Sequence, residues 1–273
     1  MQISRLQHIG CRAYAGLILL LFYFPVFCMI TASLSKKRYF SFPYPAADLT
    51  LKWYGDALAS AQVAQYVGIS LRIAALTTVC SLVIGFFSAL AYARYAWRGR
   101  KTFQRLVLLP LFFPQSVLGL ALLMWFNFLD IMPSWQTAVV AHTVWITPIV
   151  TLIMSIQAYG LDASLEEAAR DMGASRTQVL RWVTLPLLAP GMISAGCFAI
   201  LLSWGNFALS LFTTGADSAL PEWLYARMTS GYQPIIPAVG VLCVGAAILL
   251  VAAGLGLARL RQRWSTAKMS GAF

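Results

Sequence analysis

The sequence predicts an all-α membrane protein with six transmembrane helices, and three features of the chain support this. Of its 273 residues, 60% are hydrophobic and only 11% are charged, whereas a soluble globular domain carries about 25% charged residues. Six stretches are long enough to cross a bilayer, which takes about 20 mainly apolar residues. The number of Lys and Arg residues alternates between low and high in the successive segments that join these stretches. Because backbone groups in hydrocarbon must bond within their own segment, the stretches should be helices.

The six stretches share an apolar composition without Lys, Arg, Asp or Glu. They cover residues 13–34, 73–93, 106–129, 137–158, 189–212 and 236–258, and we expect residues 1–273 to form one transmembrane domain. The first stretch follows a basic segment, so a cleaved signal peptide is an alternative. Its apolar run, however, is longer than the apolar region of a signal peptide, which has roughly 7–15 residues. Prolines within three of the stretches predict kinked helices: Pro25, Pro110, Pro114 and Pro148.

The distribution of positive charge predicts that both termini face the cytoplasm. In that orientation the cytoplasmic segments hold 14 Lys and Arg and the outer segments 5, as the positive-inside rule requires. Lys36-Lys37-Arg38 lies on the wrong side, and its role is open. In a soluble protein a net charge of +11 would suggest binding to nucleic acid. Here the basic residues lie mainly in the segments predicted to be cytoplasmic, and the membrane topology accounts for them. In the long first outer loop, Leu51-Lys52-Trp53-Tyr54 predicts the start of a short interfacial helix.

The segment between the fourth and fifth stretches, residues 160–190, carries the strongest local signals. Ser164 and Glu167 have the spacing of a capping box, which predicts a helix that starts at Leu165. Glu166 and Glu167 then lie in the first turn, where the helix dipole favours negative charge. Gly173 is placed to end this helix in a left-handed conformation.

A second short helix should follow directly. Ser175 and Gln178 form another capping box, Arg181 lies near the end of that helix, and Pro186 and Pro190 predict a turn into the fifth membrane helix. The result is a cytoplasmic helix–turn–helix joined to the membrane at both ends. An amphipathic loop on the headgroups is an alternative. A DNA-reading element is disfavoured, because the membrane anchors would block a duplex groove.

This segment resembles the EAA loop of the permease subunits of binding-protein-dependent ABC importers. The family pattern is E-A-A, three residues, G, nine residues, then I-x-L-P. Here it reads Glu167-Ala168-Ala169, Gly173 and Val183-Thr184-Leu185-Pro186, with valine in place of isoleucine; Asp171 and Ala174-Ser175 are also similar to the family's surroundings. The resemblance implies a coupling helix that docks on an ATPase, with Glu167 as polar anchor, Ala168 and Ala169 as close contacts, Gly173 as the turn and Leu185-Pro186 as the joint to the fifth helix.

The resemblance also implies partners and a location. They are a cytoplasmic ABC ATPase dimer, a second homologous permease in a homo- or heterodimer, an extracytoplasmic solute-binding protein and the lipid bilayer of a bacterial inner membrane. ATP and Mg would be bound by the ATPase, since this chain lacks a G-x-x-x-x-G-K-[ST] loop. We expect no catalytic residue, cofactor, metal or nucleic acid on this chain, and we interpret its five scattered cysteines as small buried residues.

Within the family, the chain is most similar to the polyamine, opine and phosphonate branch. The residues that carry this likeness are Leu51-Lys52-Trp53-Tyr54 and Leu220-Pro221 with Tyr225, Gly231 and Pro234. One departure is Gly205-Asn206, where polyamine relatives often have an acidic pair; Trp204-Gly205-Asn206-Phe207 is similar to the W-N-x-F of sugar-type permeases. A small polar organic solute is implied, polyamine-, aminophosphonate- or opine-like, with a sugar fitting less well.

Few polar residues could line a pathway through the membrane. Asn206, Gln115, Trp204 and, more weakly, His142 are the candidates, although each polar group could instead bond between helices. A self-sufficient secondary transporter or channel is the alternative class; it typically shows inverted repeats or intramembrane ionisable residues, and neither is evident here. A membrane enzyme would need a His, Asp or Glu cluster, which the stretches lack.

Overall fold

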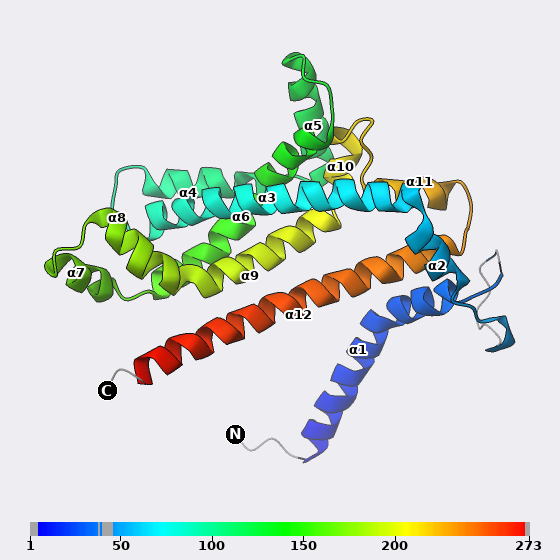
Figure 1. Ribbon diagram of the computed structural model, residues 1–273, viewed down its shortest axis with the longest axis horizontal. Helices are drawn as coiled ribbons and strands as arrows, with labels where there is room; N and C mark the ends of the chain where they lie inside the picture. Colours follow the sequence, from blue (N-terminus) through cyan, green and yellow to red (C-terminus); the bar gives the residue numbers. More distant parts are fainter. Residues whose placement is uncertain (1–4, 38, 40–45, 271–273) are drawn as a thin grey trace. The chain divides into compact units, whose positions relative to one another are not determined.

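The computed structural model describes residues 5–37, 39 and 46–270, and these residues are almost entirely helical (Figure 1). The chain divides into two compact units: Met1–Ala64 with Leu224–Ala246, and Gln65–Trp223 with Ala247–Phe273. The helices in chain order are α1 (Arg5–Ser33), α2 (Lys52–Ala59), α3 (Ala61–Ala93), α4 (Arg100–Leu108), α5 (Gln115–Phe128), α6 (Trp135–Gly160), α7 (Ala163–Asp171), α8 (Arg176–Val179), α9 (Leu185–Trp204), α10 (Phe207–Thr213), α11 (Leu220–Thr229) and α12 (Ile235–Ser270).

Five helical segments are long and apolar enough to cross a membrane. A sixth is reached if a bent pair of helices counts as one span. The prediction of an all-α membrane protein is therefore confirmed. The five segments are Gly10–Ser33, Ala61–Ala93, Trp135–Gly160, Arg176–Trp204 and Ile235–Gly256, and the bent pair is Arg100–Phe112 with Gln115–Phe128.

The third predicted stretch is a broken helix rather than a kinked one. After α4 a 3₁₀ turn runs from Leu109 to Phe112, Phe113 is extended, and α5 begins at Gln115. The two halves meet at 103°, and in Figure 1 α5 projects out of the layer formed by α3, α6 and α9. Phe113 precedes Pro114, and the residue before a proline is forced out of the helical region. By contrast, Pro25 and Pro148 lie inside continuous helices.

The fifth predicted stretch, residues 189–212, is also corrected. Instead of turning at Pro186 and Pro190, the chain forms one helical rod, Arg176–Trp204, which stops at Gly205 and Asn206 before α10. A π-helical turn, Leu180–Thr184, joins α8 to α9, and Leu185 donates to the carbonyl of Leu180. Such local adjustments allow prolines to remain inside membrane helices.

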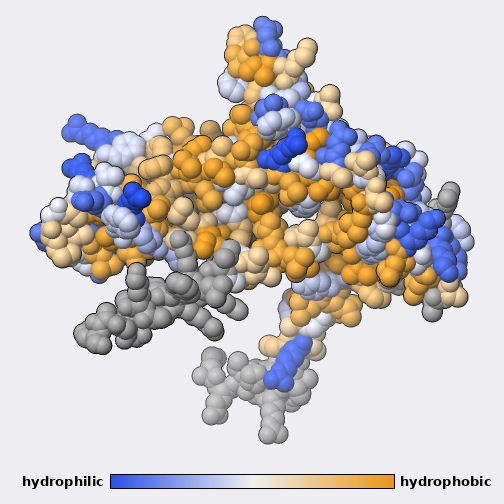
Figure 2. All heavy atoms as spheres, in the orientation of Figure 1, coloured by the Kyte–Doolittle hydropathy of each residue, from blue (hydrophilic) through white to orange (hydrophobic). Residues whose placement is uncertain are grey.

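The core of the second unit lies where α3, α6 and α9 pack together. Its fully or nearly fully buried side chains come from all three helices: Phe86, Ala89 and Leu90; Ile146, Val150, Met154 and Ala158; Leu188, Ala195 and Ala199. Small residues let the helices approach closely, as where Gly85 faces Val150. Figure 2 shows hydrophobic residues over α3 and α9 and hydrophilic ones at the end that carries α7 and α8.

In the first unit, the loop that joins α1 to α2 folds back on the end of α1. The Trp53 indole donates to the Ser35 carbonyl at 2.7 Å, and Ser35 forms an isolated β-bridge with Leu49. A short helix, α2, begins at Lys52, as the aromatic motif predicted. Of the three cations Lys36-Lys37-Arg38, Lys37 pairs with Asp48 at 3.2 Å, while Arg38 lies outside the described residues.

Candidate functional site

The first helix of the 160–190 segment begins two residues earlier than predicted. α7 starts at Ala163, and its N-cap is Asp162, whose side chain accepts a hydrogen bond from the backbone N–H of Ser164 at 3.0 Å. This bond, together with the charge of Arg94, lowers the pKa of the Asp162 carboxyl below its usual value. The expected capping box of Ser164 and Glu167 is therefore wrong, because aspartate is an equally strong cap and takes the position first.

The turn and the start of the second helix form as predicted. Gly173 has a φ of +88°, a left-handed conformation that favours glycine, and its N–H donates to the carbonyl of Arg170 at 2.8 Å. Ser175 and Gln178 form a reciprocal capping box, with bonds of 3.3 and 2.7 Å. The helix–turn–helix of α7 and α8 is thus confirmed, and each of its ends continues towards a long membrane helix.

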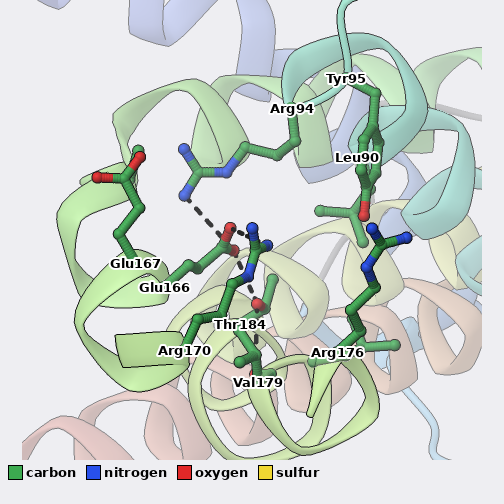
Figure 3. Close-up of a pocket in the computed structure, with 11 residues that line it drawn as sticks. Leu90, Arg94, Tyr95, Glu166, Glu167, Arg170, Arg176, Val179 and Thr184 are labelled. Atoms are coloured by element: carbon green, nitrogen blue, oxygen red, sulfur yellow. Dashed lines mark hydrogen bonds and ion pairs between the residues drawn. The ribbon is translucent and has the colours of Figure 1, made fainter. Parts of the chain in front are cut away.

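Glu166 is the best-connected side chain of this segment, although the sequence pointed to its neighbour Glu167. Its carboxylate accepts a hydrogen bond from the Thr184 hydroxyl at 2.8 Å. It also forms ion pairs with Arg94 at 3.6 Å and Arg170 at 4.0 Å. Figure 3 shows these side chains converging from α3, α7 and the π turn. Only 14% of the Glu166 side chain is exposed, so these charges lie largely outside bulk water.

Arg94 connects this carboxylate to the end of α3. It directly follows the last residue of that helix, and its side chain is 15% exposed. One guanidinium nitrogen, Nη1, donates to the carbonyl of Leu161 at 3.0 Å, in the link between α6 and α7, while Nη2 faces Glu166. Among the described residues, Nη2 and Nε have no hydrogen-bond partner. A single side chain therefore ties three parts of the chain.

These residues border a depression of about 390 Å³ beside α7. Glu167 lies on its rim in Figure 3; its side chain is exposed, and no ion pair involves it within the described part of the chain. The depression is lined by Leu90, Arg94, Tyr95, Ala163, Glu166, Glu167, Arg170, Arg176, Val179, Leu180 and Thr184.

The other residues predicted for coupling do not all face the same way. Ala168 is exposed, whereas Ala169 is buried against the chain. Asp171 is exposed at the end of α7, and Leu185 and Pro186 are exposed in the first turn of α9. The Glu166–Arg170 pair could have been found from its i,i+4 spacing, but nothing local in the sequence indicates Arg94 or Thr184.

The residues predicted to line the pathway through the membrane lie at the two helix breaks. Gln115 begins α5 after the first break, and Trp204 ends α9 at the second. Asn206 is 5% exposed, and its Oδ1 accepts from the N–H of Leu209 at 3.0 Å to cap α10. α5 packs on α10, where Gly119 contacts Phe212.

His142 braces the second break from α6. One ring nitrogen, Nδ1, lies 2.8 Å from the Ser203 hydroxyl before the break. The other, Nε2, lies 3.1 Å from the Ser210 hydroxyl after it. His142 is therefore held by neighbours on both sides of the gap between α9 and α10. Within the described residues, no group of three His, Cys, Asp or Glu could hold a metal ion.

A family model described as "Binding-protein-dependent transport system inner membrane component" matches residues 81–265, which include the α7–α8 segment and both breaks. The chain belongs to this family. It is a permease subunit of an ABC importer, a non-catalytic membrane subunit, and ATP is hydrolysed by a partner ATPase.

Relatives of this permease include polyamine transport proteins of Escherichia coli. It is 31% identical over 208 residues to the putrescine transport system permease protein PotI, covering 73% of this chain and 74% of that one. It is 26% identical over 245 residues to the spermidine/putrescine permease protein PotC, covering 89% and 92%. The resemblance to the polyamine-type branch is thereby confirmed.

Solved importers share the fold of this permease. A chain of a bacterial ABC transporter for the acidic polysaccharide alginate superposes with a TM-score of 0.70 at 19% identity, covering 93% of this chain and 98% of the other. A chain of the MetNI methionine transporter gives 0.61 at 21%, covering 72% and 93%.

Proposed function

We propose that this permease forms half of the translocation pathway of an ATP-driven importer in the bacterial inner membrane, with both termini in the cytoplasm. Its partners are then an ABC ATPase dimer that binds ATP and Mg, a second permease and an extracytoplasmic solute-binding protein. The observation that carries the proposal is a short capped helix, α7, whose backbone leads into α6 at one end and into the α8–α9 rod at the other. Motion imposed on α7 would therefore reach two membrane helices directly.

The exposed face of α7 is the surface that we propose for the ATPase. Glu167 and Ala168 are exposed and adjacent, so they offer a charged anchor beside a side chain small enough for close contact. Asp171 and Gly173 complete the exposed end of the helix, and Leu185-Pro186 form the joint to α9. Ala169, being buried, would support α7 from within instead of touching the partner.

The substrate that we propose is a small polar organic solute, and a polyamine first among these, since PotI and PotC are named for putrescine and spermidine. Gln115, Trp204 and Asn206 lie at the two breaks, and discontinuous membrane helices commonly border transporter binding sites. The face of an indole such as Trp204 attracts cations, which would suit a protonated amine in the absence of a membrane carboxylate.

Co-purification and transport test the proposal together. The permease should purify in detergent with an ATPase, a second permease and a solute-binding protein, and the reconstituted assembly should take up a polyamine only with ATP. Uptake by the pure chain alone would instead indicate a secondary transporter.

A charge reversal tests the anchor. Glu167→Lys should abolish ATP-dependent uptake while leaving membrane insertion unchanged. Asp56→Lys is the matched control, because Asp56 is an exposed acid on another short helix, α2. Unaltered uptake by Glu167→Lys would show that this residue is not the anchor.

A further inference from the structure

We infer that Arg94 and Glu166 are positioning residues that join α3 to the coupling helix α7, so that a third membrane helix follows its motion. This inference rests on the proposed role of α7. The backbone alone links α7 to α6 and, through α8, to α9; α3 has no such link, because α4, α5 and α6 intervene in the chain. The Arg94 guanidinium supplies it through Leu161 and Glu166.

Burial makes this contact more than an ordinary surface ion pair. Both side chains are about one-seventh exposed, at 15% and 14%, whereas the Arg170 side chain, the other partner of Glu166, is 50% exposed. Exposed pairs are weakened by water and salt and often contribute nothing measurable. Removing one partner of a buried pair, however, leaves a charge without compensation. Arg94 should therefore matter far more than Arg170.

The same carboxylate reaches the α9 side. Its bond to Thr184 ends in the π turn that joins α8 to α9, and the Thr184 side chain is itself buried. Glu166 thus contacts the end of α3 through Arg94 and the beginning of α9 through Thr184. Because both contacts converge on one side chain of α7, they fix its orientation about its own axis as well as its position.

The Arg94–Glu166 pair is not needed to hold the membrane helices together. α3, α6 and α9 are already packed by a core that includes Leu90, Met154 and Leu188. Loss of the ion pair leaves that core in place and releases only α7. The effect to expect is therefore on coupling, with assembly of the helices preserved.

The first experiment measures ATP hydrolysis and solute uptake in the same proteoliposomes, using the complete importer. Arg94→Gln and Glu166→Gln should each lower uptake per ATP hydrolysed by about fivefold or more, the lower end of typical coupling effects. Lys37→Gln is the matched control, because it removes one partner of the more exposed Lys37–Asp48 pair, and it should change the ratio little. The charge exchange Arg94→Glu with Glu166→Arg should recover part of the loss. An unchanged ratio in both single variants, or a loss as large in Lys37→Gln, would overturn the inference.

A second experiment separates this inference from the proposed function. Hydrogen exchange of the α7 amides in the permease, measured in detergent, needs no ATPase or substrate. Exchange should accelerate in Arg94→Gln and in Thr184→Val, which keeps every charge and nearly the same shape, while core amides of α6 stay protected. If α7 exchanges at the wild-type rate in both variants, Arg94 and Glu166 do not position it, whatever the permease transports. Failure of wild-type protein to co-purify with an ATPase would instead refute the proposed function.

Discussion

A close approach of two helices in the core, at Gly85 on α3, offers a sharp test of the packing. A Cβ atom added there would lie 2.6 Å from Cγ1 of Val150 and 3.2 Å from the backbone nitrogen of Thr151 on α6. Val150 is fully buried, and a β-branched side chain in a helix has essentially one rotamer. It cannot turn aside, so Gly85→Ala must move α3 away from α6.

The size of the effect follows from two opposing contributions. Inserting a methyl group into a packed core typically costs about 1–3 kcal/mol. Replacing glycine by alanine inside a helix stabilises the helix by about 1 kcal/mol. Gly68 provides the matched control, since it lies on the same helix and nothing stands within 4 Å of an added Cβ. Gly68→Ala has the helix stabilisation without the cost of crowding. The free energies of unfolding of Gly85→Ala and Gly68→Ala should therefore differ by about 1–3 kcal/mol.

Thermal unfolding in detergent, at one scan rate, can measure this difference. A change of 1 kcal/mol shifts Tm by roughly 2–4 °C for a chain of this size class, so Gly85→Ala should melt several degrees below Gly68→Ala. Gly191→Ala should lie between them, because its added Cβ meets the side chain of Gln157, which is exposed and can bend away. If Gly85→Ala melts with Gly68→Ala, the contact between α3 and α6 is looser than the structure shows.

Two further predictions concern pH. The lowered pKa of Asp162 means that its cap stabilises α7 at neutral pH and is lost as the pH falls through that lowered value. The protection of the α7 amides, measured against their intrinsic exchange rate at each pH, should fall there, and not in Asp162→Asn, which keeps a capping oxygen. Glu222 on α11 has the opposite shift, since partial burial raises its pKa despite bonds from the Thr214 hydroxyl at 2.7 and 2.9 Å. Ionisation of Glu222 therefore costs stability as the pH rises through the raised pKa, and Glu222→Gln should melt no lower than wild type at neutral pH; a marked loss would show that the charged form is needed.

Features with a local physical cause could be predicted from the sequence. The apolar stretches reflect a requirement of about 20 residues per span. The left-handed turn at Gly173 and the capping box of Ser175 and Gln178 depend on neighbouring residues alone. The turn and the capping box were found where expected.

Features set by distant contacts could not. Pro114 and Pro186 give the same sequence signal, yet the helix breaks before the first and continues through the second. The difference depends on whether nearby backbone groups find other partners, as the π turn allows. Likewise the i,i+4 spacing of Glu166 and Arg170 is visible in the sequence, but the contact of Glu166 with Arg94, more than 70 residues earlier, is not.

The uninterrupted rod from Arg176 to Trp204 has a geometric consequence for its C-terminal end. At 1.5 Å per residue, its 29 residues span about 43 Å. A tilt of about 10° about the Arg176 end carries the Trp204 end sideways by roughly 7 Å. Gly205 and Asn206 follow that end, so a small tilt at Arg176 becomes a larger displacement there, beside the half-helix α10 and the α5 segment packed against α10.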